Sequence, residues 1–133
     1  MRKLLVLAGL LLALSASAQI ATLKAFSTAS KAKDYYGNWK EWTETTATNI
    51  EIVVNADISR IVVFSKETHY YDILENEGSR KDSDGYEYWS YWCVNQNGLN
   101  SRIRLYKAGS KERSQMYIDY NDLYLMFNYI VLK

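Results

Sequence analysis

Apolar and polar residues alternate with a period of two along most of the chain after residue 20. Asn49–Asn55 is a clear example, because Ile50, Ile52 and Val54 fall on one face of an extended segment. Side chains alternate between the two faces of a β-strand, whereas an amphipathic helix repeats every 3.6 residues or so. The chain also contains no proline. The pattern therefore predicts a chain built of β-strands, without a helix of three turns.

The expected strands are joined by short connections, and none of these connections could hold a crossover helix. Neighbouring strands should therefore pair antiparallel, one hairpin after another. We expect an all-β fold: an antiparallel up-and-down meander of eight or nine strands. Two free edges would invite aggregation, so the sheet should form a small barrel or a curved sheet closed on itself. The expected strands are Asn38–Thr45, Asn49–Asn55, Ser59–Ser65, Thr68–Glu75, Tyr86–Val94, Asn100–Ala108, Ser114–Tyr120 and Tyr124–Leu132, with Thr22–Ser30 as a weak first strand or a loose arm.

Turn residues mark the connections between these strands. Asn95–Gly98 ends in Asn-Gly, the strongest short hairpin signal. Asn55-Ala56-Asp57 is a second turn cluster, since Asn and Asp bond their own backbone. Asn76–Gly85 is the longest polar stretch, and we expect it to be an exposed loop. Gly109–Arg113 should turn the chain again.

The first eighteen residues have the features of a secretory signal peptide. Arg2 and Lys3 precede an apolar run from Leu4 to Leu14, and Ala16-Ser17-Ala18 supplies small residues for cleavage. The apolar run is too short for a membrane-spanning helix, which needs about 20 residues. We therefore expect an exported protein, periplasmic or extracellular, with one all-β domain over residues 19–133 and no membrane span in the mature chain.

The charge balance excludes one broad class of partner. Without the expected signal peptide the chain has 14 basic and 15 acidic residues, so its net charge is close to zero. A protein that holds nucleic acid by excess positive charge should be strongly basic. No nucleic-acid partner is expected.

No arrangement of residues indicates catalysis, a metal site or a cofactor. His69 is the only histidine and has no cluster of possible zinc ligands around it in sequence. Cys93 is the only cysteine and lies in an apolar run, which favours a small buried residue. The acidic segment Asp82–Gly85 lacks the spacing of an EF-hand and is expected to be a solvated hairpin loop. We predict that the protein is not an enzyme.

Two arginines share one face of an expected strand. Arg102 and Arg104 alternate with apolar residues, and Tyr106 follows on the same face. They are too few to bind nucleic acid through salt-dependent contacts. We expect them to pair with acidic residues of a neighbouring strand.

The aromatic residues are the candidate binding site. The chain has 12 tyrosines and 4 tryptophans, and two expected strands are especially rich in them. Alternation forces these strands to show aromatic rings on both faces, so one face must meet a cavity, a partner or water. Such rings suit a glycan or another small molecule; the alternative is a protein partner or a second copy of the chain. The candidate ligand-binding residues are Trp39, Trp42, Tyr88, Trp89, Tyr91 and Trp92.

Gly37-Asn38-Trp39, preceded by Tyr36, forms a G-x-W motif at the start of an expected early strand. This motif resembles the opening motif of lipocalins and fatty-acid-binding proteins, which are barrels that hold one small apolar ligand. The match covers about five residues. In that superfamily the Trp packs beneath an Arg from a late strand, and Tyr124–Leu132 contains no Arg.

A second resemblance covers roughly the last eighty residues. Ser59–Ile73, Tyr91–Leu105 and Met116–Leu132 resemble small secreted proteins of Bacteroidetes that have no characterised activity. The resemblance implies a Gram-negative host and an exported destination, and it carries no catalytic motif. It also implies that relatives sometimes have a second Cys at the position of Ser101, which would pair with Cys93.

Overall fold

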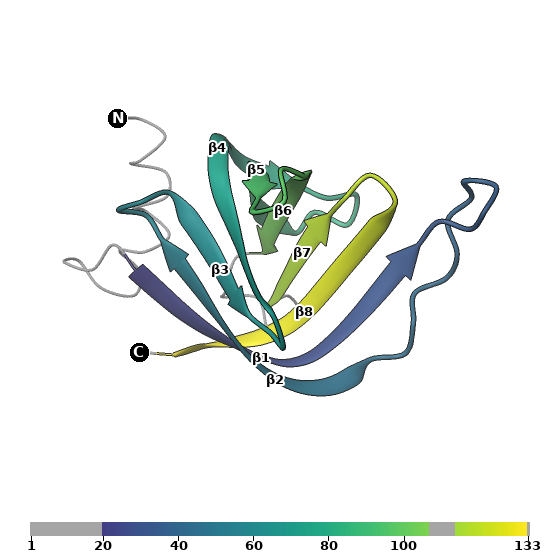
Figure 1. Ribbon diagram of the computed structural model, residues 1–133, viewed down its shortest axis with the longest axis horizontal. Coiled ribbons are helices and arrows are strands. Elements are labelled where there is room, and N and C mark those ends of the chain that lie inside the picture. Colours follow the sequence, from purple (N-terminus) through teal and green to yellow (C-terminus); the bar gives the residue numbers. More distant parts are fainter. Residues whose placement is uncertain (1–19, 107–113, 133) are drawn as a thin grey trace.

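The protein is an eight-stranded antiparallel β-barrel in the computed structural model, which describes residues 20–106 and 114–132. Each strand pairs with the next one in the chain, and β1 pairs with β8 to close the sheet (Figure 1). The prediction of an antiparallel meander closed into a small barrel is confirmed, with eight strands. These strands are β1 Ile20–Ala32, β2 Thr46–Asn55, β3 Arg60–Phe64, β4 Thr68–Lys81, β5 Glu87–Asn95, β6 Asn100–Tyr106, β7 Gln115–Asp119 and β8 Leu123–Leu132.

One end of the barrel is formed by the hairpins that follow the odd-numbered strands. There the chain turns from β1 to β2, from β3 to β4, from β5 to β6 and from β7 to β8. We call this end the mouth. The predicted signal peptide and the predicted turn at Gly109–Arg113 lie outside the described residues.

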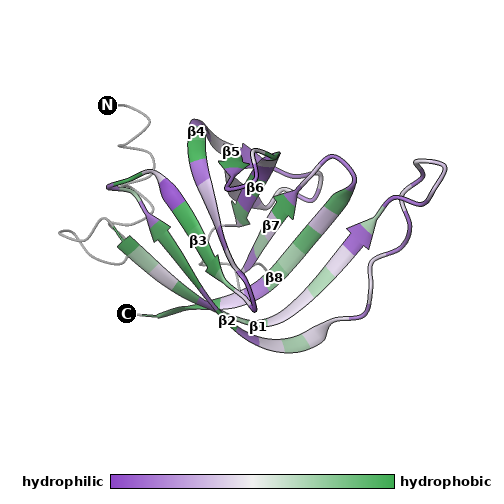
Figure 2. Ribbon diagram, in the orientation of Figure 1, coloured by the Kyte–Doolittle hydropathy of each residue, from purple (hydrophilic) through white to green (hydrophobic). Residues whose placement is uncertain are grey.

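Inward-facing side chains from all eight strands fill the barrel. Alternating residues are buried along each strand, as in Ala21, Leu23 and Ala25 of β1. In Figure 2, hydrophobic and hydrophilic bands follow one another along the strands, as expected for one face toward a core. The core consists mainly of Leu23, Ile52, Val54, Ile61, Val63, Tyr71, Tyr91, Cys93, Ile103, Leu105, Met116, Ile118, Phe127 and Tyr129.

Bulges let the long strands curve around this core. The register shifts between Ala25 and Ser27 in β1, and at two places between Ile73 and Gly78 in β4. An extra residue in one strand bends it and turns the following side chains to the other face. Leu74 falls within the first β4 bulge and is 54% exposed.

Two sequence predictions about element bounds are wrong. Asn38–Thr45 was expected to be a strand, but only Trp39 makes a β-bridge there, to Lys33, and regular pairing begins at Thr46. Asn76–Gly85 was expected to be a loop, yet β4 continues to Lys81. The bulges in β4 interrupt the period of two, so the strand is not visible in the pattern. Thr22–Ser30, for which two interpretations were open, belongs to strand β1.

The segment from residue 33 to residue 45 forms an arm that projects beyond the barrel in Figure 1. Backbone bonds from Lys40 N to Ala32 O at 2.8 Å and from Thr43 N to Ser30 O at 2.8 Å tie the arm to β1. Asp34 closes its tip by accepting bonds from the backbone of Tyr36 and Asn38. Across residues 20–106 and 114–132, no helix of sufficient length and hydrophobicity to cross a membrane is present.

Candidate functional site

The barrel places the six predicted binding residues in different locations. Trp89 and Tyr91 face the interior from β5, and Tyr91 is fully buried in the core. Tyr88 and Trp92 face outward from the same strand, as the alternation predicts. Trp39 and Trp42 lie on the arm. The six residues therefore do not form one continuous platform.

The arm carries the most exposed aromatic rings. Tyr35 is 95% exposed and Tyr36 is 83% exposed, whereas Trp39 and Trp42 are 37% and 38% exposed. Trp39 packs against Tyr124 with ring centroids 4.3 Å apart. Trp42 packs against Tyr117 of β7 with ring centroids 5.9 Å apart. The two tryptophans thus attach the arm to the outer wall of β7 and β8.

A row of tyrosines continues from this contact along the outer wall. The ring of Tyr117 packs edge to face on that of Tyr106 with centroids 5.6 Å apart, and the ring centroids of Tyr106 and Tyr88 are 5.1 Å apart. The hydroxyl of Tyr106 donates to Asp82 Oδ2 at 2.9 Å. Burial and this bond raise the pKa of Tyr106 to about 12. The row therefore consists of rings that pack on one another, and none of the three rings is exposed.

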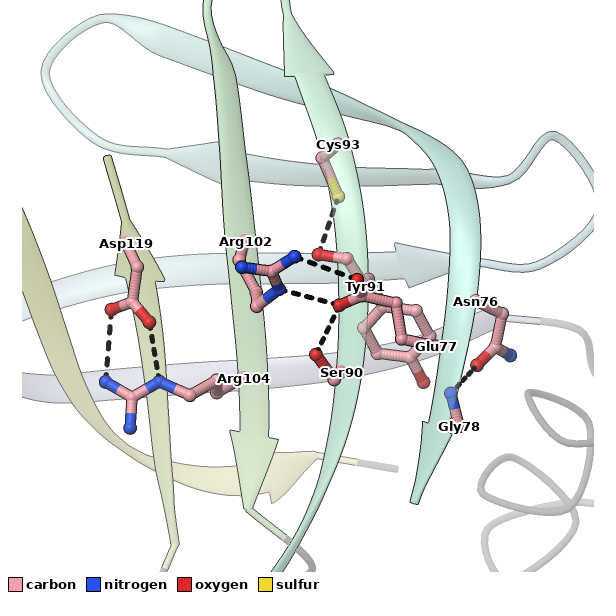
Figure 3. A network of polar contacts seen from close by, with 9 residues as sticks. All are labelled: Asn76, Glu77, Gly78, Ser90, Tyr91, Cys93, Arg102, Arg104 and Asp119. Atoms are coloured by element: carbon pink, nitrogen blue, oxygen red, sulfur yellow. Dashed lines mark hydrogen bonds and ion pairs between the residues drawn. The ribbon is translucent and has the colours of Figure 1, made fainter. Parts of the chain in front are cut away.

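Glu77 is the centre of a polar network on the outer wall (Figure 3). Arg102 of β6 reaches across β5 and binds both carboxylate oxygens of Glu77, at 2.7 and 2.9 Å. Ser90 of β5 donates to the same carboxylate at 2.6 Å. The Arg102 guanidinium holds the pKa of Glu77 at about 2. A carboxylate this acidic is a poor general base, so the network serves to join β4, β5 and β6.

Arg104 makes the second ion pair, with Asp119 of β7 at 2.7 and 3.0 Å. Its guanidinium also stacks 4.3 Å from the centroid of the Tyr117 ring. The prediction that both arginines bind acidic residues is confirmed. Only Arg104 uses the adjacent strand, however, because Glu77 lies two strands away from Arg102.

A cavity of about 470 Å³ opens at the mouth of the barrel. Its walls come from the three hairpins β3–β4, β5–β6 and β7–β8, which all end there. In the part of the chain that the structure describes, the lining is mainly apolar, with Asp122 as its only carboxylate and no Lys or Arg. The lining residues are Val63, Ser65, His69, Tyr71, Asn95, Asn97, Leu99, Tyr120, Asp122, Leu123, Leu125 and Phe127.

Three of the lining residues form a hydrogen-bonded cluster. The side-chain amide of Asn95 donates to the hydroxyl of Tyr120 at 3.2 Å, and the hydroxyls of Tyr120 and Tyr71 are 2.9 Å apart. Tyr71 is 2% exposed, and burial strongly raises the pKa of its hydroxyl. The cluster thus places the hydroxyl groups of Tyr71 and Tyr120 against a mainly apolar space.

The β5–β6 hairpin is fixed by the same asparagine. Asn95 Oδ1 accepts from the backbone N–H groups of Asn97 and Leu99, both at 2.9 Å. Gly98 has a φ of 81°, a conformation that favours glycine. The hairpin predicted from Asn-Gly is confirmed, and its first residue also supplies a donor to the cavity cluster.

His69 lies on the wall of the cavity beside the β5–β6 hairpin. Its Nδ1 is 3.3 Å from Nε2 of Gln96, and the same amide nitrogen donates to the carbonyl of Thr68. Gln96 Oε1 accepts from the backbone of Tyr70. Gln96 therefore holds the start of β4 against the hairpin, and His69 is partly buried as one member of this contact.

The acidic turn and the single cysteine considered in the sequence analysis have structural roles. Asp82 Oδ1 accepts from the backbone of Asp84 and Tyr86, which closes the β4–β5 turn. Within the described part of the chain, no three His, Cys, Asp or Glu residues are grouped so that they could hold a metal ion. Cys93 is buried, and burial raises its thiol pKa to about 12, so it is not an activated nucleophile.

Comparisons with protein-family models, with curated proteins and with solved structures find no match to this chain. Reasoning from the sequence singled out none of Tyr71, Asn95 and Tyr120 as site residues, although each was placed in or next to a predicted strand. Their positions in the chain could have indicated the site. Asn95 and Tyr120 each lie where an odd-numbered strand ends and a hairpin begins. In a closed meander, such residues lie at the same end of the barrel.

Proposed function

We propose that this protein is an exported, non-enzymatic binding protein that holds a small molecule in the cavity at the mouth of its barrel. The observation that carries the proposal is the cavity itself, about 470 Å³ in volume and lined by twelve residues from the three hairpins and their strands. Export is supported by the signal-peptide features of residues 1–18.

The size and the chemistry of the cavity both favour a small ligand. Binding pockets for small molecules measure about 300–1,000 Å³ and combine apolar walls with a few polar groups. An eight-stranded barrel is just wide enough to be filled by its side chains or to hold one small ligand. Here apolar side chains such as Leu125 and Phe127 line the walls, and the Asn95–Tyr120–Tyr71 cluster supplies the polar groups.

Fluorescence titration with the neutral dye Nile red tests this proposal. The dye should bind with a blue shift and increased emission, and Leu123→Trp should weaken binding at least tenfold because the larger side chain fills the mouth. Leu132→Trp, at the opposite end of β8, is the matched control and should leave binding unchanged. Absence of dye binding, or equal binding by both variants, would contradict a ligand site at the mouth.

The exposed rings of the arm favour a second function, contact with a protein partner or a second copy of the chain. Tyr35 and Tyr36 are 95% and 83% exposed, their rings pack edge to face with centroids 5.4 Å apart, and tyrosine is enriched among the residues that dominate protein interfaces. Light scattering tests self-association: a dimer that becomes a monomer in Tyr35→Ser/Tyr36→Ser supports this function. A monomer at all concentrations excludes self-association through the arm.

A further inference from the structure

The hydrogen bonds of the cavity cluster define which group of a ligand it can accept, and this inference rests on the proposed function. Tyr71 and Tyr120 have two hydroxyl protons between them. One proton lies in the bond between the two oxygens, which are 2.9 Å apart. Asn95 contributes a donor to Tyr120, not an acceptor.

One hydroxyl proton of the pair is therefore left over, whichever tyrosine donates to the other. If Tyr120 donates to Tyr71, the proton of Tyr71 remains; if Tyr71 donates to Tyr120, the proton of Tyr120 remains. Neither hydroxyl makes a further hydrogen bond to the residues that the structure describes, 20–106 and 114–132. Asn95 cannot accept it through Oδ1 without competing with the two backbone N–H groups of its hairpin.

The charges around the cavity decide between neutral and ionised ligands. Among the described residues, the lining contains no Lys or Arg, and His69 is its only side chain that could carry a positive charge. Asp122, which is exposed, stands on the rim. A carboxylate or phosphate would lose its hydration on entering without meeting a Lys or Arg side chain, and it would approach the negative charge of Asp122.

An ammonium group fits the cluster less well than a neutral acceptor does. It could meet the carboxylate of Asp122, but this carboxylate is exposed, and attraction between solvated charges is weak. Deeper in the cavity, an ammonium group has only donors to offer, and it would leave the spare hydroxyl proton without an acceptor.

We propose that the cavity binds an uncharged amphipathic molecule whose carbonyl or ether oxygen accepts a hydrogen bond from the Tyr71–Tyr120 pair, with its hydrocarbon part against Leu125 and Phe127. A neutral acceptor satisfies the spare proton, and the apolar walls remove the rest of the ligand from water.

Displacement of Nile red by four eight-carbon probes tests this specificity. The probes are methyl hexyl ketone, octanoate, octylammonium and octene, which share a hydrocarbon chain and differ in the end group. The ketone should compete at least tenfold more strongly than octanoate and octylammonium. Stronger competition by either ion, or equal competition by all four probes, would overturn the inference while leaving the small-molecule function in place. Failure of Nile red itself to bind would remove the proposed function instead.

Tyrosine variants then locate the hydrogen bond. The double variant Tyr71→Phe/Tyr120→Phe removes both hydroxyls. It should lower the affinity for the ketone by about 2- to 12-fold, which corresponds to the loss of one hydrogen bond, and it should leave the affinity for octene unchanged. Each single variant keeps one hydroxyl proton, so its loss should be smaller. An equal loss for ketone and octene would mean that the hydroxyls only support the shape of the cavity. The ranking of the four probes is measured on the unaltered protein and does not depend on the stability of the double variant.

Discussion

The side-chain amide of Asn95 lies 3.2 Å from the hydroxyl of Tyr120, although 25 residues separate them in the chain. This bond links the β5–β6 hairpin to the turn between β7 and β8. Asn95 Oδ1 meanwhile accepts two backbone bonds within its own hairpin. One residue therefore shapes the loop at the rim of the cavity and orients the hydroxyl cluster that faces it.

Asn95→Ala should destabilise the protein more than a substitution elsewhere in the same hairpin. The substitution removes both caps of the hairpin and the donor to Tyr120, and we expect a loss of about 2–3 kcal/mol in the free energy of unfolding. Asn97→Ala, in the same hairpin and exposed, is the matched control and should cost under about 0.5 kcal/mol. Urea unfolding measures both; equal values for the two variants would contradict the double role of Asn95.

Two buried tyrosines should respond in opposite directions to loss of the hydroxyl. Tyr129 donates to the carbonyl of Tyr106 at 2.9 Å, so Tyr129→Phe should lower the stability by about 1–2 kcal/mol. Tyr91 is fully buried, and its hydroxyl has no hydrogen-bond partner among the described residues. Tyr91→Phe should therefore raise the stability by about 1 kcal/mol, because it removes an unsatisfied polar group. Thermal and urea unfolding check the sign; a destabilised Tyr91→Phe would show that the hydroxyl has a partner.

Glu77 should contribute to the acid sensitivity of the fold. Its folded pKa, near 2, lies below the ordinary value of 4.5 because of the bond to Arg102. The stabilisation is thus present above about pH 5 and is lost as the pH falls toward 2. Because the Arg102 side chain is 46% exposed, we expect the ion pair to contribute only about 1–2 kcal/mol to the free energy of unfolding at pH 7.

Unfolding of Glu77→Gln measured between pH 7 and pH 2 tests this contribution. The variant should be less stable at pH 7 and should lose less stability on acidification. Glu75→Gln, exposed on the same strand, should keep the pH dependence of the unaltered protein. A parallel pH profile for Glu77→Gln would assign the acid sensitivity to other carboxylates.

Ser101 stands directly opposite Cys93 in the pairing of β5 with β6. Residues opposed in an antiparallel pair have Cα atoms about 4.5–5.5 Å apart, within the range that a disulfide spans. Ser101→Cys should therefore form a disulfide on oxidation and raise the stability by about 2–3 kcal/mol relative to its reduced form. Thiol titration of the oxidised variant should find no free thiol, whereas two free thiols would contradict the register of these strands.

The fold was largely predictable because its pattern is local. Alternation in segments such as Asn49–Asn55 specifies strands, and the turn at Asn95–Gly98 specifies antiparallel neighbours. We predicted a closed sheet because the two edge strands of an open sheet would be exposed to aggregation. The errors occur where a bulge breaks the alternation, in β4, and where alternation continues outside the sheet, in Asn38–Thr45. Pattern alone does not distinguish a paired strand from an extended arm that makes only two backbone bonds to β1.

The candidate site was harder to predict because it depends on contacts between distant residues. The aromatic content drew attention to Trp89 and Trp92, which alternation correctly assigned to opposite faces of one strand. The cavity cluster instead joins residues from β4, β5 and the β7–β8 turn. Their proximity follows from the register of a closed barrel, which no single segment specifies.

An NMR titration of the ¹⁵N-labelled protein with methyl hexyl ketone shows residue by residue whether a small molecule binds at the mouth. We expect amide shift changes concentrated in residues 65–71, 95–99 and 120–125, which contribute to the cavity walls. The arm and the outer face of β5 should remain unchanged. Shift changes confined to the arm, residues 33–45, or no shift changes at ketone concentrations up to its solubility, would contradict binding at the mouth.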